Sequence, residues 1–280
     1  MKRNFTITAH CLVKNEEVYF GYGVRSVIDY VDKVLIFDTG SKDATPQIAF
    51  KLTQEYPDKI VYYKKNPCNH LQQNAYKQEM LEMTKTDWFM ILDGDEVWTR
   101  RGIEEAMETI ELNKDWLDCV GADTYTCMGD IFHDHNKKLV AKFDGSVTFS
   151  LARFYKIYPG SMHWIWNPEK IDGYFMRNGK LICTIAEKTL ILKNKFWHMT
   201  KLRRSYSDDK DFTGNRLTET RKSKRRSTYF IIGEKIKEEL PEVFDEDFKK
   251  NNRLGFWKSF FNFWPYLFRK VVNKIRSDKR

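Results

Sequence analysis

The sequence has neither a cysteine framework nor a long hydrophobic run. Its five cysteines are odd in number and show no CxxC spacing, which argues against a disulfide scaffold and against a zinc site. No stretch reaches the roughly 18 uncharged apolar residues that a membrane span requires. Polar residues interrupt the first 13 positions throughout, so we expect no signal peptide. These absences favour a cytoplasmic protein with reduced thiols.

Two glycine patterns that bind phosphate groups are missing as well. The sequence contains neither GxGxxG after its first expected strand nor GxxxxGK[ST]. A nucleotide bound to this chain would therefore lack the usual cradle of backbone amides around its phosphates. We expect a divalent cation to bridge pyrophosphate to the protein instead.

The composition is that of an ordinary globular chain with a basic balance. Hydrophobic residues make up 41% and charged residues 31% of the 280 positions. The net charge of +9 favours an acidic partner such as a nucleotide phosphate, an anionic lipid or a nucleic acid. Aromatic residues reach 15%, and their excess lies towards the C-terminus.

An apolar run that ends abruptly in acidic residues is the most informative stretch. Residues 88–92 (WFMIL) suit a short strand buried on both faces. Asp93 and Asp95 follow on either side of Gly94, at the position where open α/β sheets bind ligands. The glycine allows the backbone to turn, so both carboxylates can face one hard cation. An acidic turn that caps the next helix is the alternative.

Strand and helix patterns alternate through the first half of the chain. Strands are expected at 5–13, 34–37, 60–63 and 88–92, and helices at 20–31, 45–52 and 71–83. This order predicts an α/β fold with a mostly parallel central sheet and helices on both faces. Thr45, with Pro46 behind it, is expected to cap the second helix.

Three of these strands end in polar turns that can bind a ligand. The turns contain Asn15 and Glu16, Asp38, and the pair Asp93 and Asp95. Parallel strands place their carboxyl ends along one edge, so we expect these groups to converge and to bind a nucleotide. Chance convergence remains open, because turns are generally polar.

Three motifs carry a family resemblance. CLVKNEE at 11–17, FDTGSKDAT at 37–45 and LDGDE at 92–96 resemble, in this order, the signature of family 2 glycosyltransferases with the GT-A (Rossmann-like) fold. The closest likeness is to the branch of lipopolysaccharide core β-glucosyltransferases, and it covers roughly residues 5 to 200.

The resemblance implies a function and a set of site residues. It implies an inverting transfer of a sugar from a nucleoside diphosphate donor, with a UDP-sugar favoured, to a glycan or glycolipid acceptor in cell-envelope polysaccharide synthesis. The implied nucleotide-sugar-binding residues are Val13, Asn15, Glu16, Asp38, Gly40, Gln73, Asp93 and Gly94. Asp95, of the DxD element, and His198 are the implied ligands of Mn²⁺ or Mg²⁺, with a purely structural role as the alternative for His198. Gln73 replaces a residue that is often basic in that branch, which leaves the identity of the sugar open.

The second half of the chain is expected to bind the acceptor. Residues 149–158 and 162–170 resemble the acceptor-side hairpin of the same branch. Glu169 matches the glutamate of that branch's His-Glu pair, so we expect it to be the catalytic base, with Asp172 as second choice. A surface pairing of Glu169 with Lys170 or Arg153 is the alternative.

Other patterns in this half are less specific. A helix is expected at 102–112 and a half-buried strand at 120–125, whereas 127–148 has the composition of a polar, irregular segment. Within that segment we expect His133, Asp134 and His135 to form a solvated loop, and Asp130 to be only a weak candidate base. The aromatic residues Trp164, Trp166 and Tyr174 fit the hydrophobic core better than a sugar-stacking platform.

The C-terminal part differs in composition. Residues 201–226 contain ten basic and four acidic residues, which fits a solvated segment or a positive lid over diphosphate. Residues 256–268 contain eight aromatics, and 269–280 add six basic residues and one acid. This tail fits attachment to an anionic membrane surface, or packing on the protein's own core.

These features divide the chain into three parts and leave two rival functions. We expect a GT-A domain at 1–200 (nucleotide-sugar half 1–98, acceptor half 99–200), a basic helical or lid region at 201–252 and a tail at 253–280. A sugar-phosphate nucleotidyltransferase is one rival, but it needs a glycine-rich loop where residues 14–17 read KNEE. A non-catalytic, basic lipid- or nucleic-acid-binding protein is the other, although we expect no nucleic acid partner.

Overall fold

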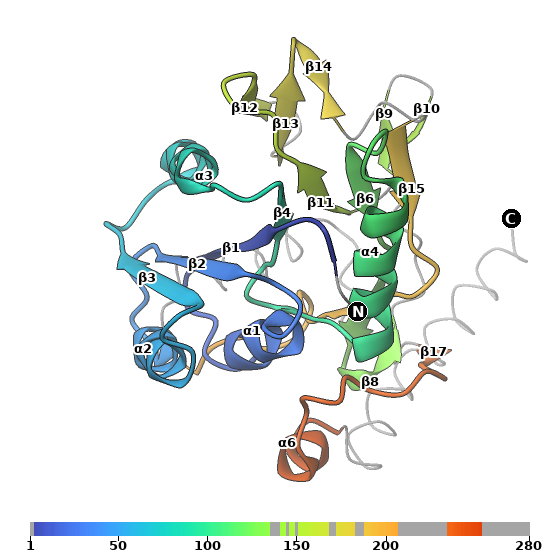
Figure 1. The fold of residues 1–280 in the computed structure, drawn as a ribbon. Coiled ribbons are helices and arrows are strands. Elements are labelled where there is room, and N and C mark those ends of the chain that lie inside the picture. Colours follow the sequence, from blue (N-terminus) through green and yellow to red (C-terminus); the bar gives the residue numbers. More distant parts are fainter. Residues whose placement is uncertain are drawn as a thin grey trace, which may run out of the picture.

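A seven-stranded sheet forms the centre of the molecule (Figure 1). The structure is a computed structural model that describes residues 3–134, 141–143, 146–148, 151–167, 172–182, 188–206 and 234–253. In spatial order the strands are β15 (Thr189–Ile191), β6 (Cys119–Gly121), β11 (Ala152–Lys156), β4 (Trp88–Ile91), β1 (Ile7–Val13), β2 (Lys33–Asp38) and β3 (Ile60–Lys64). Strand β11 is antiparallel to both of its neighbours, and the other neighbouring pairs are parallel. The predicted mostly parallel α/β sheet is confirmed.

Strand β4 is buried on both faces, as its unalternating apolar sequence predicts. Trp88 and Met90 pack into the core on one face of the sheet, and Phe89 packs into a separate cluster on the other. None of the three side chains is more than 1% exposed. The strand therefore holds the acidic turn that follows it at the centre of the sheet.

Helices cover both faces of the sheet, as predicted (Figure 1). Helices α1 (Phe20–Val27), α2 (Thr45–Glu55) and α4 (Arg100–Asn113) contribute their apolar residues to one core. Helix α3 (His70–Met83) lies on the opposite face beside a small sheet of β12 (Met162–Asn167), β13 (Asp172–Arg177) and β14 (Lys180–Leu181).

The expected cap of α2 is wrong. Thr45 is the first residue of the helix, Ala44 occupies the cap position, and the Asp43 carboxylate accepts a hydrogen bond of 3.0 Å from the Thr45 N–H. The Thr45 hydroxyl instead accepts a hydrogen bond of 2.8 Å from the backbone N–H of Glu16. The sequence pattern misplaces the cap because this threonine serves the neighbouring turn after β1.

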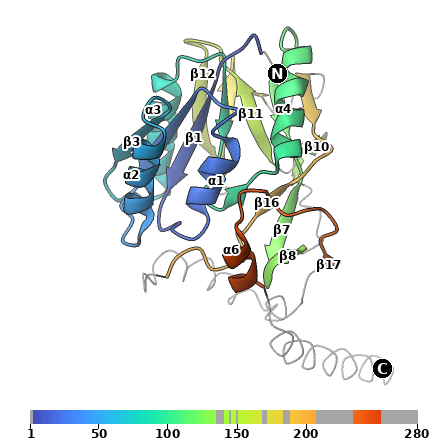
Figure 2. The same cartoon turned by 60° about the horizontal axis from the view of Figure 1, so that its bottom comes forward.

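A second sheet lies below the carboxyl ends of the central strands (Figure 2). Its strands, in spatial order, are β17 (Glu234–Lys235), β8 (Asp130–Asp134), β7 (Thr124–Met128), β16 (Phe196–His198) and β5 (Glu96–Val97). Helix α6 (Glu246–Asn251) packs against it, and Phe244, Trp197 and Tyr19 share one hydrophobic cluster. Described residues from the C-terminal third thus pack directly on the N-terminal half.

Two expected elements of the second half are wrong because the chain passes between the sheets. The single strand expected at 120–125 is split into β6 in the central sheet and β7 in the second sheet. The segment expected to be irregular, 127–148, contains β8 and the hairpin of β9 (Ala141–Phe143) and β10 (Ser146–Thr148). Cross-strand pairing, which a local pattern does not reveal, decides both cases.

The expected acceptor-side hairpin is also wrong in its pairing. Strand β11 inserts between β4 and β6, whereas β12 pairs with β13. Strand β11 therefore has a pairing partner on each side in the central sheet, and its residues Phe154 and Tyr155 are buried. Among the described residues, no helix is long and apolar enough to cross a membrane.

Candidate functional site

The turns after β1 and β2 are joined by hydrogen bonds at the carboxyl edge of the sheet. Val13 is buried, and its carbonyl accepts from the Thr39 N–H at 2.9 Å. Asn15 adopts a left-handed backbone conformation (φ 55°), which asparagine tolerates better than most residues. Its side-chain oxygen accepts from the Lys42 N–H at 2.8 Å, and its own N–H donates to Ser41 Oγ at 2.9 Å. The first two sequence motifs thus form one structural unit.

Asp38 lies inside this unit and is fully buried. Its Oδ1 accepts from the Ser41 N–H at 2.8 Å and from Ser41 Oγ at 2.7 Å, and its Oδ2 accepts from the Tyr62 hydroxyl at 3.3 Å. Gly40 has a φ of 88°, and a Cβ there would lie 2.7 Å from Pro67 Cγ. Asp38 and Gly40 therefore hold the turn after β2, and their contact with a nucleotide stays a prediction.

The third motif lies directly against the first. A Cβ added to Gly94 would lie 2.6 Å from Glu16 Cγ, so any larger residue would displace the glutamate. Gly94 does not have a positive φ, so close approach, rather than the expected turn conformation, is the reason for glycine here. The acidic turns after β1 and β4 converge, as the parallel sheet predicts.

Arg204 joins these two turns. Its Nη1 lies 2.6 Å from Glu16 Oε1 and 3.2 Å from Asp95 Oδ2. All three residues are buried, with at most 5% of each exposed. From the sequence, Arg204 is expected in a solvated or lid segment, because nothing in the local pattern distinguishes it from the other basic residues there.

Residues 203–206, which we call the strap, dock on the turn between β1 and α1. The Arg204 carbonyl accepts from the Val18 N–H at 3.1 Å, and Ser205 Oγ donates to Glu17 Oε1 at 3.3 Å. The Tyr206 N–H also donates to Glu17. The part of the expected lid from 207 to 226 lies outside the described residues.

His198 stands beside Asp95. It ends β16, pairs with Glu96 of β5, and its Nε2 lies 3.5 Å from Asp95 Oδ1. Burial opposes the charged imidazolium, but the neighbouring Asp95 carboxylate outweighs this effect and raises the pKa of His198. Its Nδ1 is buried and has no hydrogen-bond partner in the described part of the chain.

Arg153 holds the two ends of the acidic turn after β4. Its Nη2 lies 3.1 Å from Asp93 Oδ2 and also donates to Glu96 Oε1. The Glu96 side chain is fully buried, whereas 46% of the Asp93 side chain is exposed. Burial raises the pKa of Glu96 to about 7, although Arg153 opposes this rise. From the sequence, Arg153 is expected only as part of the acceptor-side hairpin or as a surface partner of Glu169, so its contacts with Asp93 and Glu96 are not predicted.

The protein groups supply part of a metal shell. Within the described residues, no three His, Cys, Asp or Glu side chains are grouped closely enough to hold an ion by themselves. Asp95 and His198 nevertheless place one carboxylate and one imidazole side by side. Such a pair fits a cation that takes its other ligands from diphosphate and water.

Gln73 lies in the first turn of α3, on the segment that follows the carboxyl end of β3. Asn74, its neighbour, accepts a hydrogen bond of 2.8 Å from the Trp164 indole N–H, and Trp164 packs edge-on against Phe175 at 4.5 Å. Trp164 is thus part of the packing between α3 and the small sheet. The side chains of Trp166 and Tyr174 lie outside the described atoms.

The expected catalytic bases lie at the margin of the described structure. Glu169 lies outside the described residues, and Asp172 begins β13 with its backbone opposite Asn167. Asp130 is buried and accepts hydrogen bonds from the Phe132 N–H at 2.8 Å and from His133 Nδ1 at 2.6 Å. The expectation that 133–135 form a solvated loop is wrong for His133 and Asp134, which belong to β8.

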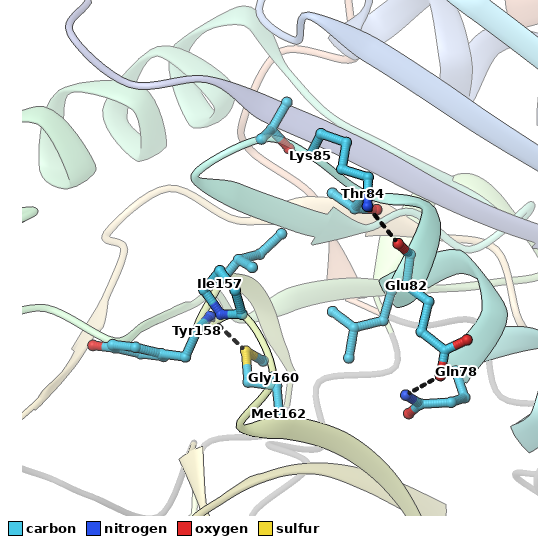
Figure 3. Close-up of a pocket in the computed structure, with 11 residues that line it drawn as sticks. Gln78, Glu82, Thr84, Lys85, Ile157, Tyr158, Gly160 and Met162 are labelled. Carbon is cyan, nitrogen blue, oxygen red and sulfur yellow. Dashed lines mark hydrogen bonds between the residues drawn. The ribbon is translucent and has the colours of Figure 1, made fainter.

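A pocket of about 520 Å³ lies away from this site, near the opposite end of β4 (Figure 3). It is lined by the end of α3, the loop before β4 and the turn after β11. Gln78 donates to Glu82 Oε1 at 2.9 Å, and Lys85 donates to the Glu82 carbonyl at 3.2 Å. The polar groups of the pocket wall form hydrogen bonds with each other, so the pocket indicates no particular ligand.

Solved structures that match parts of this chain include two bacterial proteins. TarS from S. aureus (1–349) is 14% identical over 70% of this chain and 60% of its own length, with a TM-score of 0.47. Glucosyl-3-phosphoglycerate synthase from Mycobacterium tuberculosis, in complex with Mn²⁺ and UDP-glucose, is 18% identical over 42% of this chain and 43% of its own, with a TM-score of 0.33. The chain spans only 28% of a longer TarS structure.

A sequence profile, rather than the solved structures, identifies the family of this chain. No curated protein shows significant sequence similarity to this chain. The profile of "Glycosyl transferase family 2" matches residues 11–200. This range includes all three motifs and the two outer strands of the central sheet, β3 and β15. On that match the chain belongs to glycosyl transferase family 2.

Proposed function

We propose that this chain transfers a sugar from a nucleoside diphosphate donor, with a UDP-sugar favoured, to a hydroxyl group of a glycan or glycolipid. The observation that carries the proposal is the convergence of Glu16 after β1, Asp93 and Asp95 after β4, and His198 of β16 at the carboxyl edge of the central sheet. Open α/β sheets bind their ligands at this edge. Membership of the family supports the transfer chemistry.

We propose that the donor lies across the joined turns at this edge. The residues proposed to surround it are Val13, Asn15, Glu16, Asp38, Gly40, Gln73, Asp93 and Gly94. Arg204 adds a positive charge between the first and third motifs, where it would attract the diphosphate. This contact makes the strap part of the proposed donor site.

Asp95 and His198 are the proposed protein ligands of Mn²⁺ or Mg²⁺. Their adjacent oxygen and nitrogen donors fit an ion shared with the donor diphosphate. The imidazole favours Mn²⁺, because Mg²⁺ prefers oxygen ligands. A cation bound there would offset the negative charge that develops on the departing diphosphate.

The acceptor hydroxyl needs a base on the side opposite the diphosphate. Its oxygen forms a bond to the anomeric carbon as the bond to the diphosphate breaks, and its proton passes to a carboxylate. We propose Glu169 for this role and Asp172 as the second choice, with inversion at the anomeric carbon. Glu169→Gln should bind donor normally but transfer sugar at least about 10²-fold more slowly. A near-normal kcat would pass the role to Asp172.

Donor hydrolysis tests the whole proposal. Purified protein is incubated with a panel of nucleotide sugars and Mn²⁺, and the release of nucleoside diphosphate is measured. A donor at about 100 times its Kd should also stabilise the protein by about 2.7 kcal/mol, which identifies the nucleotide in a thermal-shift screen. Release from none of the nucleotide sugars would contradict the proposal.

Two variants and a chelator test the requirement for a metal ion separately. Asp95→Asn should lower the rate about 10²- to 10³-fold, which corresponds to roughly 3–4 kcal/mol of lost electrostatic stabilisation. His198→Ala should weaken Mn²⁺ binding without unfolding the protein. Wild-type turnover that persists undiminished in excess EDTA would remove the cation from the proposal while leaving sugar transfer intact.

A further inference from the structure

Arg153 has an unusual place beneath the acidic turn after β4. Only 7% of its side chain is exposed, and its guanidinium lies over the Phe196 ring, 5.7 Å from the centroid. The same nitrogen, Nη2, contacts Asp93 and Glu96. The arginine thus connects a buried glutamate with an aspartate that is open to solvent.

An irregularity in β11 accompanies this position. The register between β11 and β6 shifts between Ala152 and Phe154, so Arg153 lies at a β-bulge. On its other side, β11 pairs regularly with β4, with Phe154 opposite Met90. Bulges commonly redirect a side chain next to a functional site. The bulge here occurs at the residue whose side chain reaches the acidic turn.

The contacts of Arg153 divide between two roles. Neutralising Glu96 would stabilise the fold, because a buried carboxylate without a partner is costly. The contact with Asp93 has a different character, since 46% of that side chain is exposed to solvent. Arg153 Nε is buried and has no hydrogen-bond partner among the described residues, so the guanidinium is not arranged to satisfy its own donors fully.

We propose that Arg153 is a positioning residue for sugar transfer, which holds the Asp93 carboxylate in one orientation towards the nucleotide sugar. This inference rests on the proposed function, in which Asp93 contacts the donor. A carboxylate on a turn has rotational freedom, and an ion pair from a packed strand removes it before the donor binds. Loss of such a supporting partner typically costs 10- to 100-fold in affinity or activity.

A double-mutant cycle separates positioning from neutralisation. The reference protein is Glu96→Gln, which removes the buried charge and keeps the contact between Arg153 and Asp93. Adding Arg153→Gln removes the arginine without leaving a buried glutamate unpaired. Relative to the reference, the doubly substituted protein should lose about 10- to 100-fold in kcat/KM for the donor.

The decisive measurement is the effect of Asp93→Asn in each background. We expect it to lower kcat/KM at least about 10-fold when Arg153 is present, and only about two- to three-fold when Arg153 is absent, because the two residues act as a unit. The affinity for UDP with Mn²⁺, measured by calorimetry, should show the same non-additivity. An equal effect of Asp93→Asn in both backgrounds would overturn the inference.

Two further variants keep the outcome interpretable. Arg177→Gln removes another arginine–carboxylate pair, with Asp118, and should leave the effect of Asp93→Asn unchanged. If the protein carrying Glu96→Gln and Arg153→Gln does not fold, Arg153→Lys replaces Arg153→Gln in the cycle, because lysine keeps the charge but loses the planar fork.

The proposed function and the role of Arg153 can fail separately. If the wild type hydrolyses no nucleotide sugar, the proposed function fails. If it transfers sugar and the cycle is additive, only the role of Arg153 fails.

Discussion

Three buried carboxylates of the candidate site, those of Glu16, Asp95 and Glu96, each face a cationic side chain from a distant part of the chain. Arg204 pairs with Glu16 across 188 positions, and Arg153 pairs with Glu96 across 57. Burying a carboxylate costs several kcal/mol unless a partner compensates for it. The acids can be recognised from the sequence because they follow apolar strands, whereas no local pattern marks the carboxylate partners of the two arginines.

A buried histidine in strand β1 of the central sheet gives a pH-dependent prediction. His10 is 6% exposed, lies 4.7 Å from the Phe89 ring, and its Nε2–H donates to Thr84 Oγ1 at 2.6 Å. Burial lowers the pKa of His10 to about 3. Since the unfolded pKa is near 6.5, the unfolded state binds the proton first, and stability falls as the pH drops below about 6.5.

The predicted loss is about 2 kcal/mol in the free energy of unfolding between pH 7 and pH 5 from this residue alone. His10→Gln keeps a hydrogen-bond donor and removes the titration. Urea denaturation at the two pH values should therefore show a smaller pH effect in the variant than in the wild type. Identical pH dependence in the two proteins would show that His10 is not the group responsible.

Asp38 provides a second prediction at this scale. Because both of its oxygens accept hydrogen bonds inside the protein, Asp38→Ala should lower the free energy of unfolding by about 1–3 kcal/mol. Tyr62→Phe is the matched control, since it removes one of these hydrogen bonds and leaves the carboxylate in place. A raised KM for the donor at unchanged stability would instead support the base-binding role implied by the resemblance.

At the scale of elements, the first half of the chain could be predicted because its patterns are local. The apolar run 88–92 and the strand at 34–37 match β4 and β2 within one residue at each end. In the second half, β6 and β7 are consecutive in sequence but belong to different sheets. Their separation depends on pairing with β11 and β16, which are distant in sequence, so no window of the sequence could show it.

The strap is the element whose substitution is most informative. Arg204→Gln removes its contacts with Glu16 and Asp95, so we expect a loss of about 3–5 kcal/mol in the free energy of unfolding, measured in EDTA. Added Mn²⁺ should stabilise this variant more than the wild type, because the ion returns positive charge beside Asp95.

The control for the substitution of Arg204 is a lysine–glutamate ion pair on the surface. Lys249 pairs with Glu246, whose side chain is 90% exposed, so Lys249→Gln should change stability by less than about 1 kcal/mol. Equal stabilisation of wild type and Arg204→Gln by Mn²⁺ would show that the ion does not bind beside Asp95.

At the scale of the whole molecule, the described C-terminal segment is part of the folded unit. Phe244 and Phe248 pack on Tyr22 of α1, and the Tyr22 hydroxyl donates to Asp245 at 3.0 Å. The Glu242 carboxylate accepts from the Arg100 N–H at 3.0 Å. The expected division at residue 200 is therefore a boundary in composition, while residues 234–253 pack with the N-terminal half.

These contacts define where the chain can be shortened. A protein that ends at Arg253 keeps the packing of α6 and loses residues 254–280, which carry seven basic residues and one acidic residue. We predict that the full chain floats with vesicles containing anionic lipid, since aromatic and basic residues together favour an interface. The shortened protein should no longer float but should still hydrolyse the donor. Replacing Arg269, Lys270, Lys274 and Arg276 by Gln in the full chain should weaken flotation while keeping the aromatic residues in place. Aggregation of the shortened protein would show instead that the tail belongs to the hydrophobic core.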